Sequence, residues 1–137
     1  MNGIWVLTTT FYRSTDETRF HLAAQLVGNA VALDHAVVIV DGSPNPTIGE
    51  AFLRIGATVA PQKAQGMGGS RRELFKIADT YRRNDGDYWW SPKIFLWLEP
   101  EKVDLIRWIP QIIAPIERGE ADIVIPALTD EGHASRP

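Results

Sequence analysis

Short apolar runs alternate with segments of helical periodicity along the chain, and this alternation constrains the fold more than any single motif. Strands are predicted at residues 3–9, 36–40, 57–60, 93–98 and 122–125. Helices are predicted at residues 14–33, 47–54, 70–83 and 100–118. Strands and helices in this order form parallel sheets through right-handed crossovers. The sequence therefore predicts an α/β fold, a Rossmann-like three-layer sandwich with a mostly parallel sheet.

Capping and breaking residues set the predicted helix boundaries. Ser14 and Glu17 have the spacing of a capping box, so the first helix is expected to begin there. Gly56 is expected to end the second helix. Pro110 and Pro115 lie within the last predicted helix, where they predict a kink or a break. Residues 61–70 are predicted to form a flexible loop.

Composition limits the classes of protein to which the chain can belong. Its 137 residues fit one α/β domain, assigned to residues 1–128, followed by a polar tail at residues 129–137. The formal net charge of −3 predicts no nucleic-acid partner, and the absence of cysteine excludes disulfides and thiolate metal sites. The sequence shows no transmembrane segment and no signal peptide, so a cytoplasmic location is expected. An unpaired sheet edge and the adjacent Trp89 and Trp90 favour a homo-oligomer.

Polar residues gather at the predicted carboxyl ends of the strands. Threonines occupy positions 8–10, Asp-Gly-Ser follows the second strand at positions 41–43, and Glu-Pro-Glu follows an apolar run at positions 99–101. A glycine-rich segment at residues 66–69 leads into a helix. The carboxyl ends of parallel strands share one edge of the sheet, and open α/β sheets bind ligands there. We therefore expect these groups to converge on one ligand site.

The chemistry of these groups suits a phosphorylated ligand. Gly66, Gly68 and Gly69 can expose backbone N–H groups to an anion at the start of a helix, and Arg71 would add positive charge. The segment is not a P-loop, because the Lys-Ser/Thr ending is missing. Asp41 could hold a nucleotide ring or ribose through hydrogen bonds.

Each group also has a purely structural explanation. The glycine-rich segment could be a mobile linker, and the threonines could only finish a strand. Asp41 with the glycine and serine after it is ordinary turn chemistry. Glu99 and Glu101 offer the oxygen ligands that a hard divalent cation prefers, but acidic residues around a first-turn proline also complement a helix dipole.

The order and spacing of these features resemble the N-terminal, nucleotide-sugar-binding half of the GT-A-type, family-2-like glycosyltransferases. Residues 40–43, Val-Asp-Gly-Ser, are similar to the family's Val-Asp-Asp-Gly-Ser. Residues 69–78 resemble the family's Gly…Ala-Arg-Asn…Ala helix start, and residues 95–101 fall where the family has an apolar strand that runs into Asp-x-Asp. Residues 119–125 are similar to the family's next strand, and the whole resemblance covers residues 3–127.

The resemblance implies a GT-A fold and a glycosyltransferase that binds a nucleoside-diphosphate sugar and transfers the sugar to an acceptor. On this basis Asp41 would contact the base or ribose of the nucleotide. Thr8, Thr10 and Tyr12 would line the base pocket. Arg71, at the family's arginine position, would serve the nucleotide or its phosphates.

The same resemblance assigns Glu99 and Glu101 to a Mg²⁺ or Mn²⁺ ion that bridges the diphosphate and acts as a Lewis acid. The glutamates replace the family's aspartates, so each carboxylate reaches one methylene further. The family continues into an acceptor-binding half that carries the catalytic base of inverting members. No catalytic residue is therefore assigned, and residues 129–137 are expected to begin that half.

Two other functions are consistent with the sequence. The first is a non-catalytic nucleotide-sugar-binding or regulatory module of the same fold. The second is a flavodoxin-like or receiver-like domain, but this class predicts an acidic cluster at the end of the first strand. The chain has threonines at that position, so this function ranks last.

Overall fold

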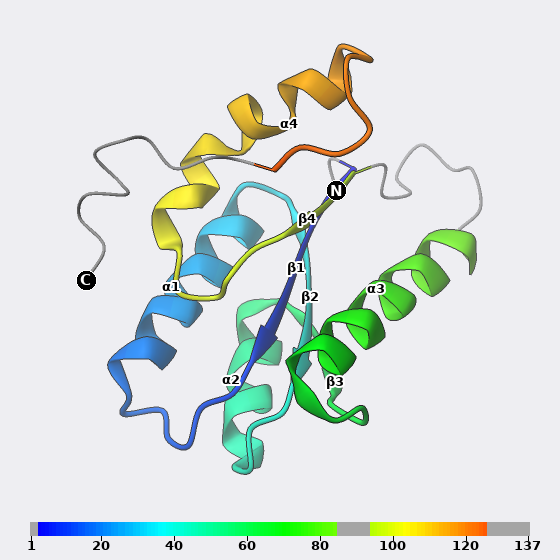
Figure 1. Cartoon of the computed structure of the whole chain (residues 1–137). Coiled ribbons are helices and arrows are strands. Elements are labelled where there is room, and N and C mark those ends of the chain that lie inside the picture. The colour runs from blue at the N-terminus through cyan, green and yellow to red at the C-terminus, as the bar shows by residue number, and fades with distance from the viewer. Residues whose placement is uncertain (1–2, 85–93, 126–137) are drawn as a thin grey trace, which may run out of the picture. The chain divides into compact units, whose positions relative to one another are not determined.

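Four parallel strands form the sheet of the computed structural model, which describes residues 3–84 and 94–125 (Figure 1). The strands are β1 (Ile4–Thr10), β2 (Ala36–Asp41), β3 (Thr58–Pro61) and β4 (Ile94–Trp97). Every described pairing is parallel, and the strand order is β3-β2-β1-β4. The predicted α/β fold with a parallel sheet is thus confirmed.

The strand order reverses at β1. The chain moves outward from β1 through β2 to β3 and then returns to place β4 on the other side of β1. In the register of the sheet, Thr10 lies opposite Asp41, and Leu7 lies opposite Trp97. Open α/β sheets bind ligands outside the carboxyl ends of their strands at such a reversal. The topology therefore favours a site at the ends of β1 and β4.

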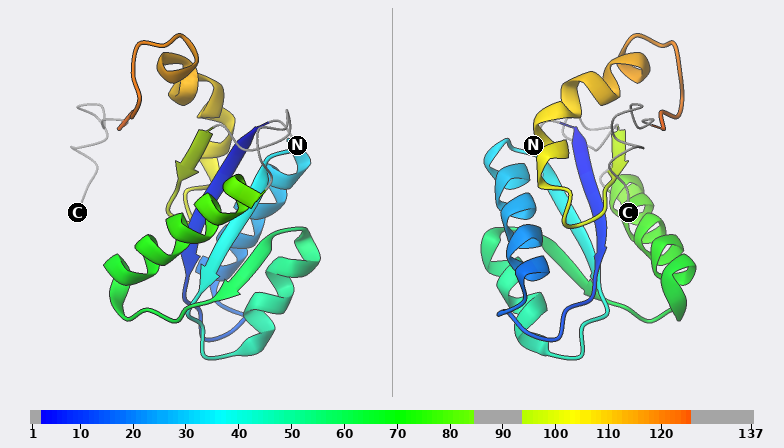
Figure 2. Two further views of the ribbon diagram at one scale, coloured as in Figure 1. Left: turned by 90° about the vertical axis from the view of Figure 1, so that its right-hand side faces the viewer. Right: turned by 60° about the vertical axis from the view of Figure 1, so that its left-hand side comes forward.

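Helices cover both faces of this sheet (Figure 2). On one face, α1 (Thr18–Ala32) packs on β2 and α2 (Pro46–Ile55) packs on β3, while the two helices contact each other. On the other face, α3 (Gly66–Asn84) packs on β1 and β2. The three layers are compatible with a Rossmann-like fold.

Apolar side chains join the layers on both faces of the sheet. Under α3 the buried cluster consists of Trp5, Leu7, Val38, Val40, Leu74 and Ala78. Under α1 and α2, the rings of Phe20 and Phe52 lie 5.4 Å apart between centroids. Because β-strand side chains alternate between faces, each apolar strand supplies both cores.

Two predicted helix starts are wrong. α1 begins at Thr18 rather than at Ser14, because Glu17 occupies the N-cap position and its carboxylate accepts a hydrogen bond from the Arg13 backbone N–H at 2.9 Å. α3 begins at Gly66 rather than at residue 70, so part of the predicted flexible loop is helical. In both cases the local spacing identified a helix but misplaced its first turn.

The helix predicted over residues 100–118, with a kink or break at its prolines, begins later and forms two elements. A 3-10 helix spans Val103–Trp108, and α4 spans Ile109–Glu117. The break expected from the prolines is confirmed, because Pro110 lies in the first turn of α4, where its missing N–H costs no hydrogen bond. The chain also divides between residues 106 and 107 into two compact units.

The predicted strand at residues 122–125 is absent from the described structure. An apolar run forms a strand only where a neighbour can complete its ladder of hydrogen bonds, and this segment pairs with no strand among the described residues. Trp89, Trp90 and residues 129–137 lie outside the described residues. In the described part of the chain, no helix has the length and apolar character needed to cross a membrane.

Two glycines at the contact between α1 and α2 give a matched test of this packing. Gly56 ends α2 as predicted, with φ +121°, and a Cβ there would meet Val31 Cγ1 at 3.2 Å. The Gly56→Ala substitution is expected to lower the free energy of unfolding by about 1–2 kcal/mol. Gly28 lies inside α1, where a Cβ would make an ordinary 3.8 Å contact with Ile55.

The Gly28→Ala substitution is therefore expected to raise the free energy of unfolding by about 0.5–1 kcal/mol, since alanine is the better helix former. Urea denaturation of both variants measures the two effects. Equal changes in the two proteins would contradict the packing of α1 against α2.

Candidate functional site

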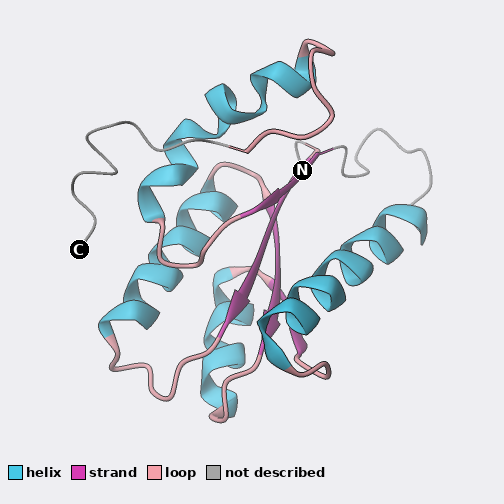
Figure 3. Cartoon of the chain, viewed as in Figure 1, coloured by secondary structure: helices cyan, strands magenta, loops and turns pink. Residues whose placement is uncertain are grey.

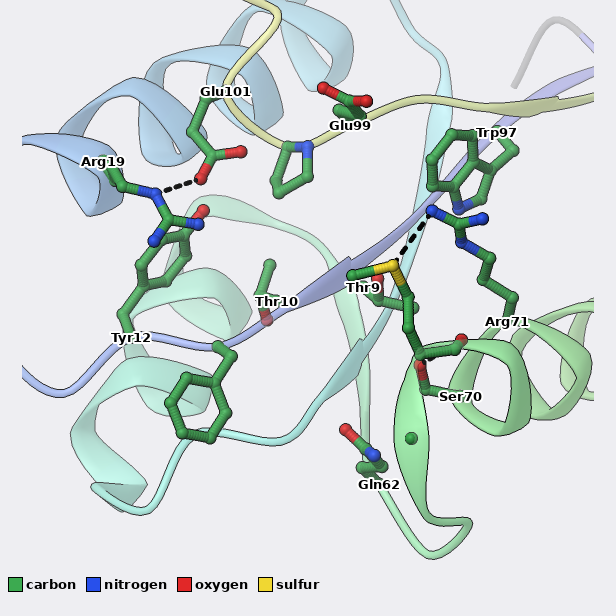
Figure 4. A pocket seen from close by; sticks show the side chains of 14 residues that line it. Thr9, Thr10, Tyr12, Arg19, Gln62, Ser70, Arg71, Trp97, Glu99 and Glu101 are labelled. Atoms are coloured by element: carbon green, nitrogen blue, oxygen red, sulfur yellow. Dashed lines mark hydrogen bonds and ion pairs between the residues drawn. The ribbon is translucent and has the colours of Figure 1, made fainter.

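A pocket of about 450 Å³ lies at the carboxyl ends of β1 and β4, at the reversal of strand order (Figure 4). This volume falls within the range of small-molecule sites. Its walls come from the loop after β1, the first turn of α1, the start of α3 and the loop after β4. The lining residues are Thr9, Thr10, Phe11, Tyr12, Arg19, Gln62, Gly66, Met67, Ser70, Arg71, Trp97, Glu99, Pro100 and Glu101.

Two of the predicted threonines have different roles. Thr8 is fully buried and donates a hydrogen bond to the backbone carbonyl of Leu98 at 2.6 Å, so it does not line the pocket. This bond ties β1 to the start of the loop that carries Glu99. Thr10 lines the pocket and donates to Asp41 Oδ1 at 2.8 Å. Thr8 therefore positions the pocket wall, and Thr10 forms part of it.

Asp41 organises the loops after β1 and β2 and does not line the pocket. Besides the bond from Thr10, its Oδ1 accepts bonds from the Ser43 hydroxyl at 2.6 Å and the Ser43 backbone N–H at 3.2 Å. The Ser43 hydroxyl in turn accepts a bond from the Tyr12 backbone N–H at 2.9 Å. This network holds Tyr12 at the pocket. Both the turn chemistry and the position at a strand end that the sequence indicated are present.

The glycine-rich segment forms the first turn of α3 at the edge of the pocket. Gly66 lines the pocket and has φ +77°, a backbone conformation that L side chains rarely adopt. Gly68 and Gly69 do not line it; a Cβ at Gly69 would lie 3.2 Å from the Cβ of Ala64, so this glycine permits close packing. The start of α3 therefore faces the pocket with its positive helix dipole.

Glu73 fixes the loop that precedes α3. Its carboxylate accepts hydrogen bonds from the backbone N–H groups of Lys63, at 2.9 Å, and Ala64, at 2.7 Å. Both bonds lower the pKa of Glu73, and the bond from Lys63 has the larger effect. The carboxylate is therefore ionised at neutral pH, and the loop is held against the helix that carries Arg71.

Arg71 presents a positive charge to the pocket. Its guanidinium carbon lies 4.4 Å from the ring centroid of Trp97, and its Nη2 lies 3.3 Å from the Met67 sulfur. No carboxylate in the described part of the chain forms an ion pair with it. Stacking on the ring, with one weak hydrogen bond to the Met67 sulfur, leaves the other guanidinium donors available to an anion.

Arg19, Glu101 and Tyr12 form the other side of the pocket. Arg19 Nε lies 2.8 Å from Glu101 Oε1, and its guanidinium lies over the Tyr12 ring, 5.5 Å from the centroid. The hydrogen bond to Glu101 raises the pKa of Arg19. Tyr12 is 1% exposed, and its hydroxyl lies against Glu101 without a partner at full hydrogen-bonding geometry among the described residues. Burial, and then the Glu101 charge, raise the pKa of Tyr12 well above its ordinary value.

The Mg²⁺ or Mn²⁺ site at Glu99 and Glu101 stays a prediction, and the two side chains have other ionic partners in the structure. Both line the pocket and belong to the loop after β4, drawn in pink in Figure 3, rather than to the first turn of a helix. Figure 4 shows the Glu101 carboxylate turned toward Arg19 and the Glu99 carboxylate turned away from it. Glu101 is paired with Arg19, and Glu99 is 60% exposed and lies 4.0 Å from Lys102 Nζ. The described residues contain no cluster of three side chains suited to a metal ion.

Sequence reasoning missed several residues of the pocket. Trp97 had a usable signal, because it is the last residue of β4 and stands at the carboxyl edge. Phe11 lines the pocket and is exposed, and it follows the threonines that were identified. Arg19 had no local signal, because its partner Glu101 is 82 positions away along the chain.

Comparison of the chain with known proteins does not assign a function to this pocket. The chain matches no protein-family model, no curated protein and no solved structure. Its function has to follow from the side chains that line the pocket and from their place in the sheet.

Proposed function

We propose that this chain is a glycosyltransferase-like domain that binds a nucleoside-diphosphate sugar and transfers the sugar to an acceptor. The observation that carries the proposal is the pocket at the reversal of strand order, where Arg71 near the start of α3 has no ion-pair partner among the described residues. Helix starts and arginine side chains are the groups that bind phosphates in α/β sheets. A GT-A fold, suggested by the resemblance described above, accounts for the same arrangement.

The two ends of the pocket would serve different parts of the ligand. Arg71 and the start of α3 would contact the phosphates, since both offer donors to an anion. Phe11 is exposed at the pocket and would stack on a nucleotide base. Thr10 and Tyr12 would close the floor beside it.

A binding module without transfer is the second candidate. Transfer to an acceptor hydroxyl needs a base that removes its proton. Of the two carboxylates at the pocket, Glu101 is paired with Arg19, and Glu99 is largely exposed to solvent. Neither is held as a base in the described part of the chain, and this observation keeps the module as the second candidate.

Calorimetric titration with UDP, GDP and their sugars tests the proposed function. At least one nucleoside diphosphate is expected to bind with a dissociation constant of about 1–100 μM, and the affinity is expected to fall as salt screens the arginines. Release of the diphosphate on addition of an acceptor would identify the enzyme rather than the module. Failure of every nucleoside diphosphate to bind would overturn both candidates.

A further inference from the structure

We propose that Arg19 and Arg71 together bind the diphosphate of the ligand without a divalent cation. In the free protein Arg19 pairs with Glu101, and it exchanges this partner for the phosphates when the ligand binds. This inference rests on the proposed function and states how the same pocket recognises its ligand. Two guanidinium groups carry the same formal charge as one divalent cation. They approach the pocket from two sides in Figure 4, Arg71 from α3 and Arg19 from α1.

Arg71 is already arranged for a phosphate. The Trp97 ring lies 4.4 Å from its guanidinium carbon and orients the planar group without using its hydrogen-bond donors on a carboxylate. A phosphate can accept two parallel hydrogen bonds from such a fork. The start of α3, which carries Arg71, adds the positive end of a helix dipole on the same side of the pocket.

Arg19 can leave Glu101 for a phosphate with little loss of free energy. Its ion pair with Glu101 is short, at 2.8 Å, but the Arg19 side chain is 69% exposed and that of Glu101 is 22% exposed. Exposed ion pairs contribute little to stability, because water screens them and long side chains lose entropy in forming them. A diphosphate with two or more negative charges competes well with a single carboxylate for the same guanidinium.

Tyr12 can donate a hydrogen bond to the Glu101 carboxylate once Arg19 has moved to the phosphates. The Tyr12 hydroxyl is buried against Glu101, but no atom of the described residues meets it at full hydrogen-bonding geometry. A buried hydroxyl is stabilised by a well-aligned acceptor, and the Glu101 carboxylate is within its reach. When Arg19 turns to the phosphate, this hydroxyl can donate to the vacated carboxylate. Its raised pKa keeps it protonated, and therefore a donor, at neutral pH.

Titration with UDP and GDP in buffer containing EDTA, and again with Mn²⁺, tests the proposal. In wild-type protein, the dissociation constant of the tighter nucleotide is expected to differ by less than about threefold between the two buffers. A tenfold or greater gain in affinity with Mn²⁺, or binding only with Mn²⁺, would overturn the arginine proposal and leave the proposed function standing; tenfold here corresponds to about 1.4 kcal/mol. No binding of either nucleotide in either buffer would overturn both.

The Glu101→Gln substitution distinguishes binding by the arginines from binding through a metal ion, because the two predict opposite changes in affinity for the nucleotide. It removes a negative charge beside the phosphates and keeps an oxygen that can accept from Arg19. Affinity for the nucleotide in EDTA is expected to rise by about threefold, because repulsion is lost. If Glu101 were a metal ligand, the same change would instead weaken binding, and weaker binding in this variant would contradict the proposal.

The Tyr12→Phe substitution tests the exchange of partners and guards against effects on folding. The variant loses a hydroxyl whose contact with Glu101 does not reach full hydrogen-bonding geometry among the described residues, so its melting temperature is expected to change little. Its affinity for the nucleotide is expected to fall by about threefold to tenfold, because Glu101 is left without a donor in the complex. Unchanged affinity in a folded Tyr12→Phe protein would contradict the exchange.

Discussion

Replacement of Arg71 by alanine is expected to weaken nucleoside-diphosphate binding by about tenfold to a hundredfold. The reason is that Arg71 is the unpaired cation of the pocket: it stacks 4.4 Å from the Trp97 ring centroid and forms no ion pair in the described part of the chain. Hydrogen bonds from a charged donor to a phosphate are among the strongest single contacts in a binding site. Calorimetry with UDP and GDP measures the loss.

The neighbouring Arg72 provides a matched control. It carries the same charge on the same helix and is exposed, but it does not line the pocket. The Arg72→Ala substitution is expected to change affinity by less than about threefold, through the long-range field alone. An equal loss in both variants would show that net charge, rather than a contact at the pocket, controls binding.

Replacement of Leu74 by alanine is expected to lower the free energy of unfolding by about 2–5 kcal/mol. Leu74 is fully buried and packs α3 against Trp5 and Leu7 of β1 and against Val38 and Val40 of β2. Truncation removes apolar contacts and leaves a cavity in close-packed surroundings. Urea denaturation measures the change through the shift of the midpoint at constant slope.

Leu53 gives the control for this substitution. It lies on α2 and is 54% exposed, so the Leu53→Ala change removes the same atoms from a position that solvent already reaches. Its effect on the free energy of unfolding is expected to stay within about 0.5 kcal/mol. A loss at Leu74 as small as that at Leu53 would contradict the placement of α3 over the sheet.

Local signals predicted the fold well where periodicity and boundary residues agreed. The apolar runs gave β1 and β2, and the helix that ends at Gly56 has an apolar stripe and a glycine stop. Prediction failed where a partner decides the structure. Residues 122–125 have strand-like composition but no ladder partner among the described residues. The break near Pro110 was foreseen, but the 3-10 geometry before it was not.

The site shows the same division between local and long-range information. Thr10 and Arg71 were predicted from their positions at a strand end and a helix start, and both line the pocket. Thr8 was grouped with Thr10 because the sequence could not show that its hydroxyl bonds to Leu98 inside the fold. The ion pair of Arg19 and Glu101, which occupies one of the predicted metal ligands, could not be read from any local pattern.

Amide NMR spectra recorded while UDP or GDP is added test whether the nucleotide binds in this pocket, because they locate the ligand on the chain. The largest shift changes are expected at residues 9–12, 66–71 and 97–101, around the pocket. Gly28 and Gly56, at the contact of α1 and α2, should stay unchanged. Largest changes elsewhere, such as in the shallow groove around Ala60, Ile77 and Tyr81, or no changes at saturating nucleotide, would contradict binding in this pocket.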